Sequence, residues 1–473
     1  MKNISLIKTL TVALVVFLLI SSASAYQAYP HNELTDQVDR LFERWDKDDS
    51  PGLALGIFKD GRIIYARGYG MANLEYGIPN TPQTVFRTGS VSKQFTAMCI
   101  AILADQGKLS LDDNIRRFIP EMPEYETPVT IRHLVHHTSG VRDYLTLQSL
   151  ALKSDADYYT NQDVLDIITW QKELNFPPGD QYLYSNSGYF LLAEIIARAS
   201  GMPTKEFAEK YIFEPLGMNN THFHDDRNLI VKNRASGYSP SRGGYRISMT
   251  QLEMIGDGGV FTTMEDMFEW DNNFYDNMLG SPGLMNVVLT PGIFNDGTRQ
   301  TYAFGLRVDK YRGIDIVGHG GAFVGFRAAN LQFPDHKFSV VILANTSAIN
   351  PSALCERVAD IYLENYFTEP KAVPQRREGT SSQSPENINL PVSELRKYVG
   401  EYYSEELRVT YIIELVDDKL KFTHRNTPGA FFMAVAENEF IVRGLRVKFT
   451  GGRNSGFEIN AGRVQHIRFN KIK

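Results

Sequence analysis

The sequence predicts an α+β fold: an antiparallel sheet flanked by helices, with an all-helical subdomain and a small C-terminal all-β barrel. Three observations predict it. Strand-like runs occur at both ends of residues 26–367, with strong helical runs between them. The stretch 368–390 is rich in Pro, Ser, Gln and charge, as a linker is. Residues 391–473 then contain short alternating strands separated by turn residues, which is typical of a small barrel or sandwich.

Composition excludes several classes of protein. The chain has 473 residues, of which 43% are apolar and 22% charged, as in ordinary multi-domain globular proteins. Its formal net charge of −6 has the wrong sign for electrostatic binding of nucleic acid. The two cysteines, Cys99 and Cys355, lie in apolar helical runs, so we expect free buried thiols rather than a disulfide framework.

The first 25 residues resemble a targeting signal. Lys2 and Lys8 lie before an apolar run at 10–20, and the small residues after this run finish with the Ala-x-Ala pattern of Ala23 and Ala25. This pattern is typical of a cleavable secretory signal, with cleavage after Ala25. A membrane-spanning anchor needs about 20 apolar residues, and this run is shorter. We therefore expect a secreted or periplasmic protein without a stable membrane anchor.

The predicted sheet is built from both ends of the body. The β-rich runs 53–58 and 62–66 flank Asp60 and Gly61, a pair that favours a tight hairpin turn. Further strands and a closing helix are expected near the other end, at 313–318, 327–333, 338–344 and 352–367.

Two strong helical runs lie between these strands. The first, 90–107, ends at Gly107, and the second, 189–200, is followed by Gly201. Glycine is a common residue just after a helix, which supports both boundaries. These helices predict the all-helical subdomain.

The segment around Ser90 is the first candidate for chemistry. Lys93 follows Ser90 by three residues, so that on a helix the amine and the hydroxyl lie on the same face. A serine hydroxyl is a poor nucleophile without a neighbouring base, and lysine can act as that base when its pKa is lowered. Alone, the pattern is weak, because a helix-capping serine followed by a solvated lysine is common.

Tyr184 and Asn186 form a second motif, directly before the helical run 189–200. An ammonium group beside a phenol can stabilise its phenolate, so Tyr184 near Lys93 could move a proton between Ser90 and a leaving group. Asn186 would anchor a substrate amide or hold Lys93. Alone, this segment is also compatible with a core aromatic and a helix cap.

A third motif, at residues 318–322, follows the predicted strand 313–318 and contains His319 and Gly321. Glycines beside a strand allow a substrate to approach the backbone closely. A backbone N–H there could pair with that of Ser90 to hold a tetrahedral oxyanion. The alternative for His319 is a turn histidine whose hydrogen bonds are satisfied locally.

In this order and spacing, the motifs Ser-x-x-Lys, Tyr-x-Asn and His-x-Gly resemble those of the serine β-lactamase and penicillin-binding-protein superfamily. More narrowly, they resemble the branch of class C β-lactamases, D-alanyl-D-alanine carboxypeptidases, D-aminopeptidases and esterases. The resemblance covers about residues 35–367 and implies a β-lactamase-like fold there. It includes the framework segments 137–141, 191–196, 258–263, 320–326 and 341–345. Residues 395–473 resemble, less specifically, the lipocalin-like domain appended to such hydrolases.

The resemblance implies roles for individual residues. Ser90 would be the acylated nucleophile, and Lys93 and Tyr184 would share the general-base and general-acid work. The N–H groups of Ser90 and Ala322 would form the oxyanion hole. The residues expected to bind the substrate or its oxyanion are Asn186, His319, Gly321 and Ala322.

His319 departs from the β-lactamase pattern, in which a lysine takes this position. A lysine is cationic and recognises a substrate carboxylate, whereas a histidine is only partly charged near pH 7. The departure favours a D-aminopeptidase or esterase over an efficient β-lactamase. The triplet His133, His136 and His137 lies in the framework, and the pair His222 and His224 has no third ligand nearby, so we expect no metal and no cofactor.

The leading interpretation is a secreted serine hydrolase that forms an acyl-enzyme on amide or ester bonds. The candidate substrates are D-amino-acid peptides, cell-wall peptides, esters and β-lactam-like molecules. One alternative is a non-catalytic penicillin-binding-like sensor or scaffold, although the serine, lysine and tyrosine are all present. Another places the function in the C-terminal barrel, which carries no motif of its own. The polar stretch 368–390 also predicts few contacts between the body and the barrel.

Overall fold

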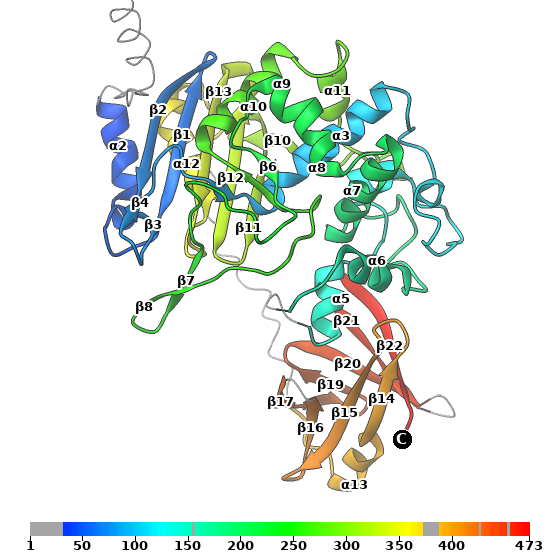
Figure 1. The fold of residues 1–473 in the computed structure, drawn as a ribbon. Coiled ribbons are helices and arrows are strands. Elements are labelled where there is room, and N and C mark those ends of the chain that lie inside the picture. The colour runs from blue at the N-terminus through cyan, green and yellow to red at the C-terminus, as the bar shows by residue number, and fades with distance from the viewer. Residues whose placement is uncertain (1–31, 154–156, 372–386, 425–426, 452–454) are drawn as a thin grey trace, which may run out of the picture.

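The computed structural model describes residues 32–153, 157–371, 387–424, 427–451 and 455–473. Figure 1 shows a mixed sheet-and-helix body and a separate β-structure that lies beside the helices of the body. The predicted α+β fold class is therefore confirmed. The predicted signal segment 1–25 and most of the predicted linker lie outside the described residues.

The body is organised around a six-stranded antiparallel sheet in the order β10-β11-β12-β13-β1-β2. Asp60 and Gly61 join its first two strands with positive φ angles of 51° and 69°, as the Asp-Gly turn predicts. The strand predicted at 313–318 continues to Phe323, and a strand at Arg307–Tyr311 was not predicted. The strands are β1 (Leu53–Lys59), β2 (Arg62–Tyr69), β10 (Arg307–Tyr311), β11 (Ile314–Phe323), β12 (Phe326–Phe333) and β13 (Phe338–Ala344).

Helices cover both faces of this sheet (Figure 1). α2 (Glu33–Phe42) and α12 (Pro351–Tyr362) share one apolar cluster with the strands, and α10 (Met264–Asp276) packs on β1 and β13 from the other side. Both cysteines are free and buried, as expected, one in α12 and one in the central helix described next.

Two helices form the centre of the helical subdomain. α3 (Lys93–Asp105) is buried on all sides over most of its length, which explains its nearly continuous apolar sequence. α7 (Asn186–Ser200) packs against it, begins after the capping hydroxyl of Ser185 and ends at Gly201, whose φ is 75°. Around them lie α4 (Ile131–Val135), α5 (Tyr144–Leu150), α6 (Asn161–Thr169), α8 (Thr204–Ala208), α9 (Glu214–Leu216) and α11 (Leu284–Val288).

Short strands connect the sheet to the helices. A three-stranded sheet in the order β5-β9-β6 runs beside the start of α3, and two hairpins lie near the edge of the body. Their bounds are β3 (Met71–Asn73), β4 (Ile78–Pro79), β5 (Phe86–Arg87), β6 (His222–Phe223), β7 (Tyr238–Ser241), β8 (Gly244–Ile247) and β9 (Val260–Thr262).

The C-terminal part is a nearly closed antiparallel barrel in the order β17-β16-β15-β14-β22-β21-β20-β19-β18. Buried and exposed residues alternate along its last strand, so that one face fills the barrel. The chain enters it through α13 (Val392–Leu395). The strands are β14 (Gly400–Ser404), β15 (Val409–Val416), β16 (Lys419–His424), β17 (Thr427–Phe431), β18 (Met433–Ala436), β19 (Glu439–Val442), β20 (Leu445–Thr450), β21 (Gly456–Ala461) and β22 (Val464–Lys471).

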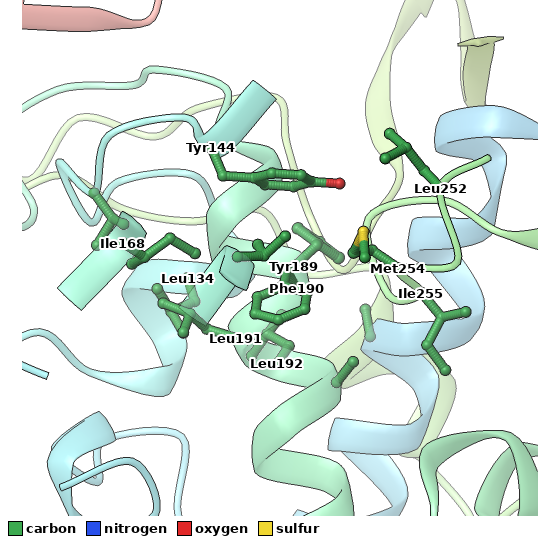
Figure 2. Close-up of a cluster of buried hydrophobic side chains, with 14 of the residues drawn as sticks. Leu134, Tyr144, Ile168, Tyr189, Phe190, Leu191, Leu192, Leu252, Met254 and Ile255 are labelled. Carbon is green, nitrogen blue, oxygen red and sulfur yellow. The ribbon is translucent and has the colours of Figure 1, made fainter. Parts of the chain in front are cut away.

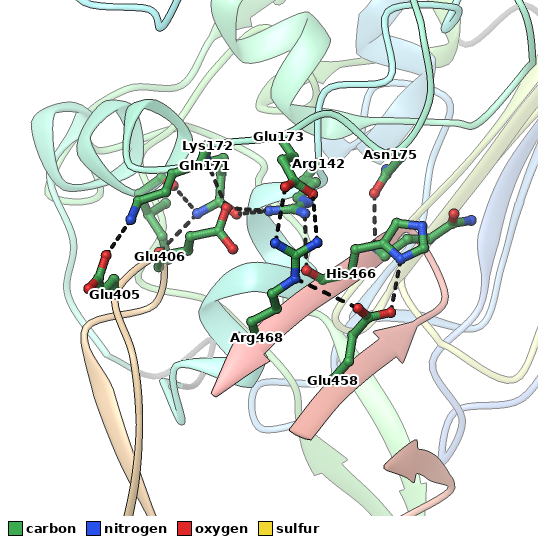
Figure 3. A network of polar contacts seen from close by, with 12 residues as sticks. Arg142, Gln171, Lys172, Glu173, Asn175, Glu405, Glu406, Glu458, His466 and Arg468 are labelled. Atoms are coloured by element: carbon green, nitrogen blue, oxygen red, sulfur yellow. Dashed lines mark hydrogen bonds and ion pairs between the residues drawn. The ribbon is translucent and has the colours of Figure 1, made fainter. Parts of the chain in front are cut away.

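The expectation of few contacts between the body and the barrel is wrong. The Arg142 guanidinium donates to the Glu406 carboxylate at 2.7 Å, and both side chains are buried in the junction. The Gln171 side chain donates to the Glu406 carbonyl at 2.9 Å, and Arg468 pairs with Glu173 at 3.2 Å (Figure 3). A polar sequence between two parts therefore says little about the surfaces that meet elsewhere.

No helix among the described residues combines the length and the apolar character needed to cross a lipid bilayer.

Candidate active site

Ser90 lies in a 3₁₀ turn, Gly89–Ser92, that leads directly into α3. The turn is held from behind, because the Ser92 hydroxyl accepts a hydrogen bond from the Val260 N–H at 3.0 Å and lies 3.0 Å from the Thr88 hydroxyl. Ser90 faces a cavity of about 520 Å³ that the helical subdomain and the sheet share. The nucleophile predicted from the sequence therefore lies on a rigid support and borders open space.

Lys93 is completely buried at the start of α3. Its Nζ donates to the Ser90 Oγ at 3.3 Å, to the Asn186 Oδ1 at 2.9 Å and to the Asp257 carbonyl at 2.5 Å. Burial lowers the Lys93 pKa to about 8, an effect that the nearby carboxylates of Asp257 and Asp143 only partly offset. A substantial fraction of the amine is then neutral near physiological pH and able to accept a proton from Ser90.

Two cations lie close to the ring of Tyr184. The Lys93 Nζ lies 4.8 Å from the centre of its ring, and the Arg463 guanidinium lies 4.7 Å from it. Burial raises the Tyr184 pKa well above its ordinary value, an effect that the Ser90 hydroxyl only partly offsets. The sequence argument foresaw a stabilised phenolate, whereas the surroundings of Tyr184 favour a neutral phenol that can donate a proton.

Asn186 is the first residue of α7, and its backbone and side chain have separate partners. Its N–H donates to the Asp143 carboxylate at 2.7 Å, which satisfies one of the free amides at the helix start. Its side-chain oxygen accepts from Lys93. Of the two roles that the sequence left open, the geometry corresponds to holding the lysine.

The strand β11 brings its glycines against the turn that carries Ser90. A Cβ on Gly321 would lie 1.9 Å from the Thr88 carbonyl oxygen, and a Cβ on Gly89 would lie 2.8 Å from the Ala322 nitrogen. Only glycine permits this approach, which brings the Ala322 amide close to the Ser90 turn. The arrangement is compatible with the two-amide oxyanion hole that we expected.

His319 lies on the same strand and borders the cavity. The Tyr302 hydroxyl lies 3.0 Å from its Nε2, and the Gly320 carbonyl lies 2.6 Å from its Nδ1. Burial, reinforced by Lys93, lowers the His319 pKa to about 4. The imidazole is therefore neutral at pH 7 and supplies hydrogen bonds instead of charge.

The structure adds residues that the sequence analysis missed. Asp257 contacts Lys93 through its carbonyl, and burial raises the pKa of its carboxyl to about 6. The buried Asp143 binds the start of α7, and Arg463 comes from the turn between β21 and β22. The pair Gly258-Gly259 after Asp257 was a possible signal, whereas nothing near Arg463 in the sequence marks it as a site residue.

The histidines that were considered as metal ligands have local partners. His133 Nδ1 accepts from the Thr130 N–H at 3.1 Å, and His137 Nδ1 accepts from the Ser185 N–H at 3.2 Å. Among the described residues, no group of three His, Cys, Asp or Glu side chains is arranged to hold a metal ion. These histidines position the framework around the site.

Comparison with known proteins finds D-aminopeptidases and a penicillin-binding protein among the relatives of this chain. A D-aminopeptidase of Gluconobacter oxydans (strain 621H) is 31% identical over 62% of this chain and 56% of its own length. The chain thus spans just over half of that relative. A penicillin-binding protein of Bacillus subtilis (strain 168) is 29% identical over 77% of this chain and 82% of its own length.

Solved structures share the fold. The octameric penicillin-binding protein homologue from Pyrococcus abyssi superposes with a TM-score of 0.63 at 23% identity, over 93% of this chain and 100% of that one. The family model described as Beta-lactamase matches residues 38–360, more than two thirds of the sequence. The chain belongs to the beta-lactamase family.

Proposed function

We propose that this protein is an exported serine hydrolase that cleaves amide bonds next to D-amino acid residues through an acyl-enzyme. The single observation that carries the proposal is the buried Lys93, whose pKa is lowered to about 8 and whose Nζ lies 3.3 Å from the Ser90 Oγ. The D-aminopeptidases among the relatives support the substrate class. Export rests on the predicted signal at residues 1–25, which lies outside the described residues.

The contacts of Ser90 support the following sequence of steps. Neutral Lys93 removes the proton from Ser90 as its Oγ bonds to the substrate carbonyl carbon. The negative charge that develops on the carbonyl oxygen is held by the N–H groups of Ser90 and Ala322. Tyr184 then gives its proton to the leaving nitrogen as the C–N bond breaks, and the Lys93 ammonium returns a proton to Tyr184. A water oxygen then bonds to the acyl carbon, the bond from that carbon to the Ser90 Oγ breaks, and a proton from the water returns to the Oγ as the acid leaves.

Covalent labelling tests the proposal. A fluorophosphonate or a fluorescent penicillin is expected to add once to the wild-type chain, and peptide mapping is expected to place the adduct on Ser90. Ser90→Ala removes the label. Ser352→Ala is the matched control, since Ser352 borders the same cavity but has no hydrogen bond to a lysine among the described residues. A label that persists in Ser90→Ala would contradict the assignment of the nucleophile.

Turnover separates an enzyme from a binder. We expect the wild type to release product repeatedly from D-alanine p-nitroanilide or from p-nitrophenyl butyrate, and Ser90→Ala to release none above background. A single stoichiometric burst without turnover would instead support the non-catalytic sensor. That outcome would remove hydrolysis as the function while keeping Ser90 as the acylated residue.

A further inference from the structure

The turn between β21 and β22 carries one residue of the barrel into the cavity of the body. Arg463 is that residue, and it borders the same cavity as Ser90, Tyr184 and His319. Its guanidinium stacks over the Tyr184 ring at 4.7 Å. The active-site cavity is therefore completed by a residue that is far from the three motifs in sequence.

The backbone of this turn is fixed from both sides. The Asn175 side chain donates to the Arg463 carbonyl at 2.9 Å and accepts from the Gln465 N–H at 2.8 Å. The buried pair of Arg142 and Glu406 holds the neighbouring part of the barrel to the same region of the body (Figure 3). A group held in this way loses little conformational freedom when it binds a ligand.

The guanidinium of Arg463 retains its hydrogen-bonding capacity. Its side chain is 43% exposed, and among the described residues it makes no hydrogen bond. Its nearest counter-charge is Asp143, at 3.8 Å from the nitrogen, and the buried Asp143 carboxylate already accepts from Asn186 and Thr146. The planar set of N–H donors is thus free to bind a carboxylate in a two-pronged geometry.

The charge of the cavity wall favours an anionic ligand. Three arginines border the cavity, and Asp257 is the one acidic side chain on its described wall. Arg327 donates to backbone carbonyls, and Arg87 is buried beside Phe323. Arg463 is the cation that combines free donors with exposure to the cavity.

We propose that Arg463 binds the free C-terminal carboxylate of a peptide substrate. The barrel would then select peptides from which the C-terminal residue is released, as by a carboxypeptidase. The proposal rests on the proposed function, in which Tyr184 protonates the leaving nitrogen. Since Arg463 lies over the Tyr184 ring, the carboxylate that it binds belongs to the departing residue. A substrate ammonium on the departing residue would instead meet the like charge of Arg463.

Direct binding tests the proposal without turnover. The probes are N-acetyl-D-alanyl-D-alanine and its C-terminal amide, titrated calorimetrically into the full chain carrying Ser90→Ala. We expect the acid to bind at least about tenfold more tightly than the amide, because charge-assisted hydrogen bonds are worth more than neutral ones. Adding Arg463→Gln is expected to bring the ratio close to one, and Arg463→Lys to restore part of the preference.

Arg468→Gln is the matched control, because Arg468 lies on β22, directly after the turn that carries Arg463, but pairs with Glu173 outside the cavity. It is expected to keep the ratio of the parent chain. An unchanged ratio in Arg463→Gln, or no preference for the acid in the parent, would overturn the proposal. Labelling and ester hydrolysis by the wild type report separately on the proposed function, so the two failures are distinguishable.

Discussion

The interior around α7 and the junction between the body and the barrel are stabilised by different combinations of contacts. Around α7 the interior is apolar: Leu191, Phe190 and Leu134 pack there with the ring of Tyr144 (Figure 2). The junction with the barrel adds ion pairs and hydrogen bonds (Figure 3) to an apolar cluster that continues from the body into the barrel. The apolar region buries the lysine and thereby sets its pKa, whereas the polar junction places a cation at the mouth of the cavity. We infer that the body determines the chemistry and the barrel the selection of substrates.

The largest expected effect comes from the body. Lys93→Met keeps an unbranched side chain that is only one atom shorter and suits the buried position, but it removes the base beside Ser90. We expect the rate of acylation by a fluorophosphonate to fall by about a thousandfold or more. Stopped-flow or gel-based labelling measures it, and circular dichroism checks the fold. A loss below tenfold would show that another group activates the serine.

The junction is expected to affect stability strongly at one point. Glu406→Ala leaves the buried Arg142 without its carboxylate, which costs about 3 kcal/mol in the free energy of unfolding. Glu405→Ala at the same junction removes an exposed pair with Lys172 and costs less than about 1 kcal/mol. Urea denaturation compares the two variants. Equal losses would mean that the junction is solvated as a whole.

A smaller effect is expected when a residue of the body is replaced by one that binds an anionic group of the substrate. His319→Lys replaces a neutral imidazole by a cation on the cavity wall. The ratio of kcat/KM for nitrocefin, which bears a carboxylate, to that for p-nitrophenyl acetate is expected to rise about tenfold. A parallel fall in both activities would show that His319 has a structural role instead.

The smallest effect concerns pH. Because burial lowers the Lys93 pKa to about 8, the neutral amine increases as the pH rises toward that value. For a neutral ester, kcat/KM is expected to increase about fivefold between pH 7 and 8 and to level off above pH 9. His319, with a pKa of about 4, adds no step between pH 5 and 7. The Asp257 carboxyl, with a pKa of about 6, is largely ionised at pH 7, before this increase. A rate that stays flat between pH 7 and 9 would contradict the role of Lys93.

The residues of the site differ in how visible they are in the sequence. Ser90 and Lys93 share one helix turn, so local spacing alone relates them. Part of the body's sheet was visible for the same reason, since β1 and β2 form a local hairpin, whereas the edge strand β10 was not predicted. Tyr184 and His319 needed the family resemblance, because only the folded chain brings their segments to Ser90. The protonation of Tyr184 depends on burial, which no local pattern reports.

Arg463 could not be found from sequence at all. It lies in an ordinary turn between two strands, and its contact with the body depends on how the barrel is docked. The polar stretch before the barrel predicted two independent parts, yet the contacts that join them come from Glu406 and the last two strands. Linker composition reports on the connection itself and not on surfaces that meet elsewhere.

The position of Arg463 near the C-terminal end of the sequence means that the cavity wall is completed late in synthesis. Residues of all three motifs leave the ribosome before Arg463, which follows Tyr184 by 279 positions. Contacts over such sequence distances form late, because a long loop must close first. A nascent or proteolytically shortened chain can therefore hold Ser90 and Lys93 in place while one wall of the cavity is still missing. Until the barrel docks, such a chain would react with substrates without the selection that we propose for Arg463.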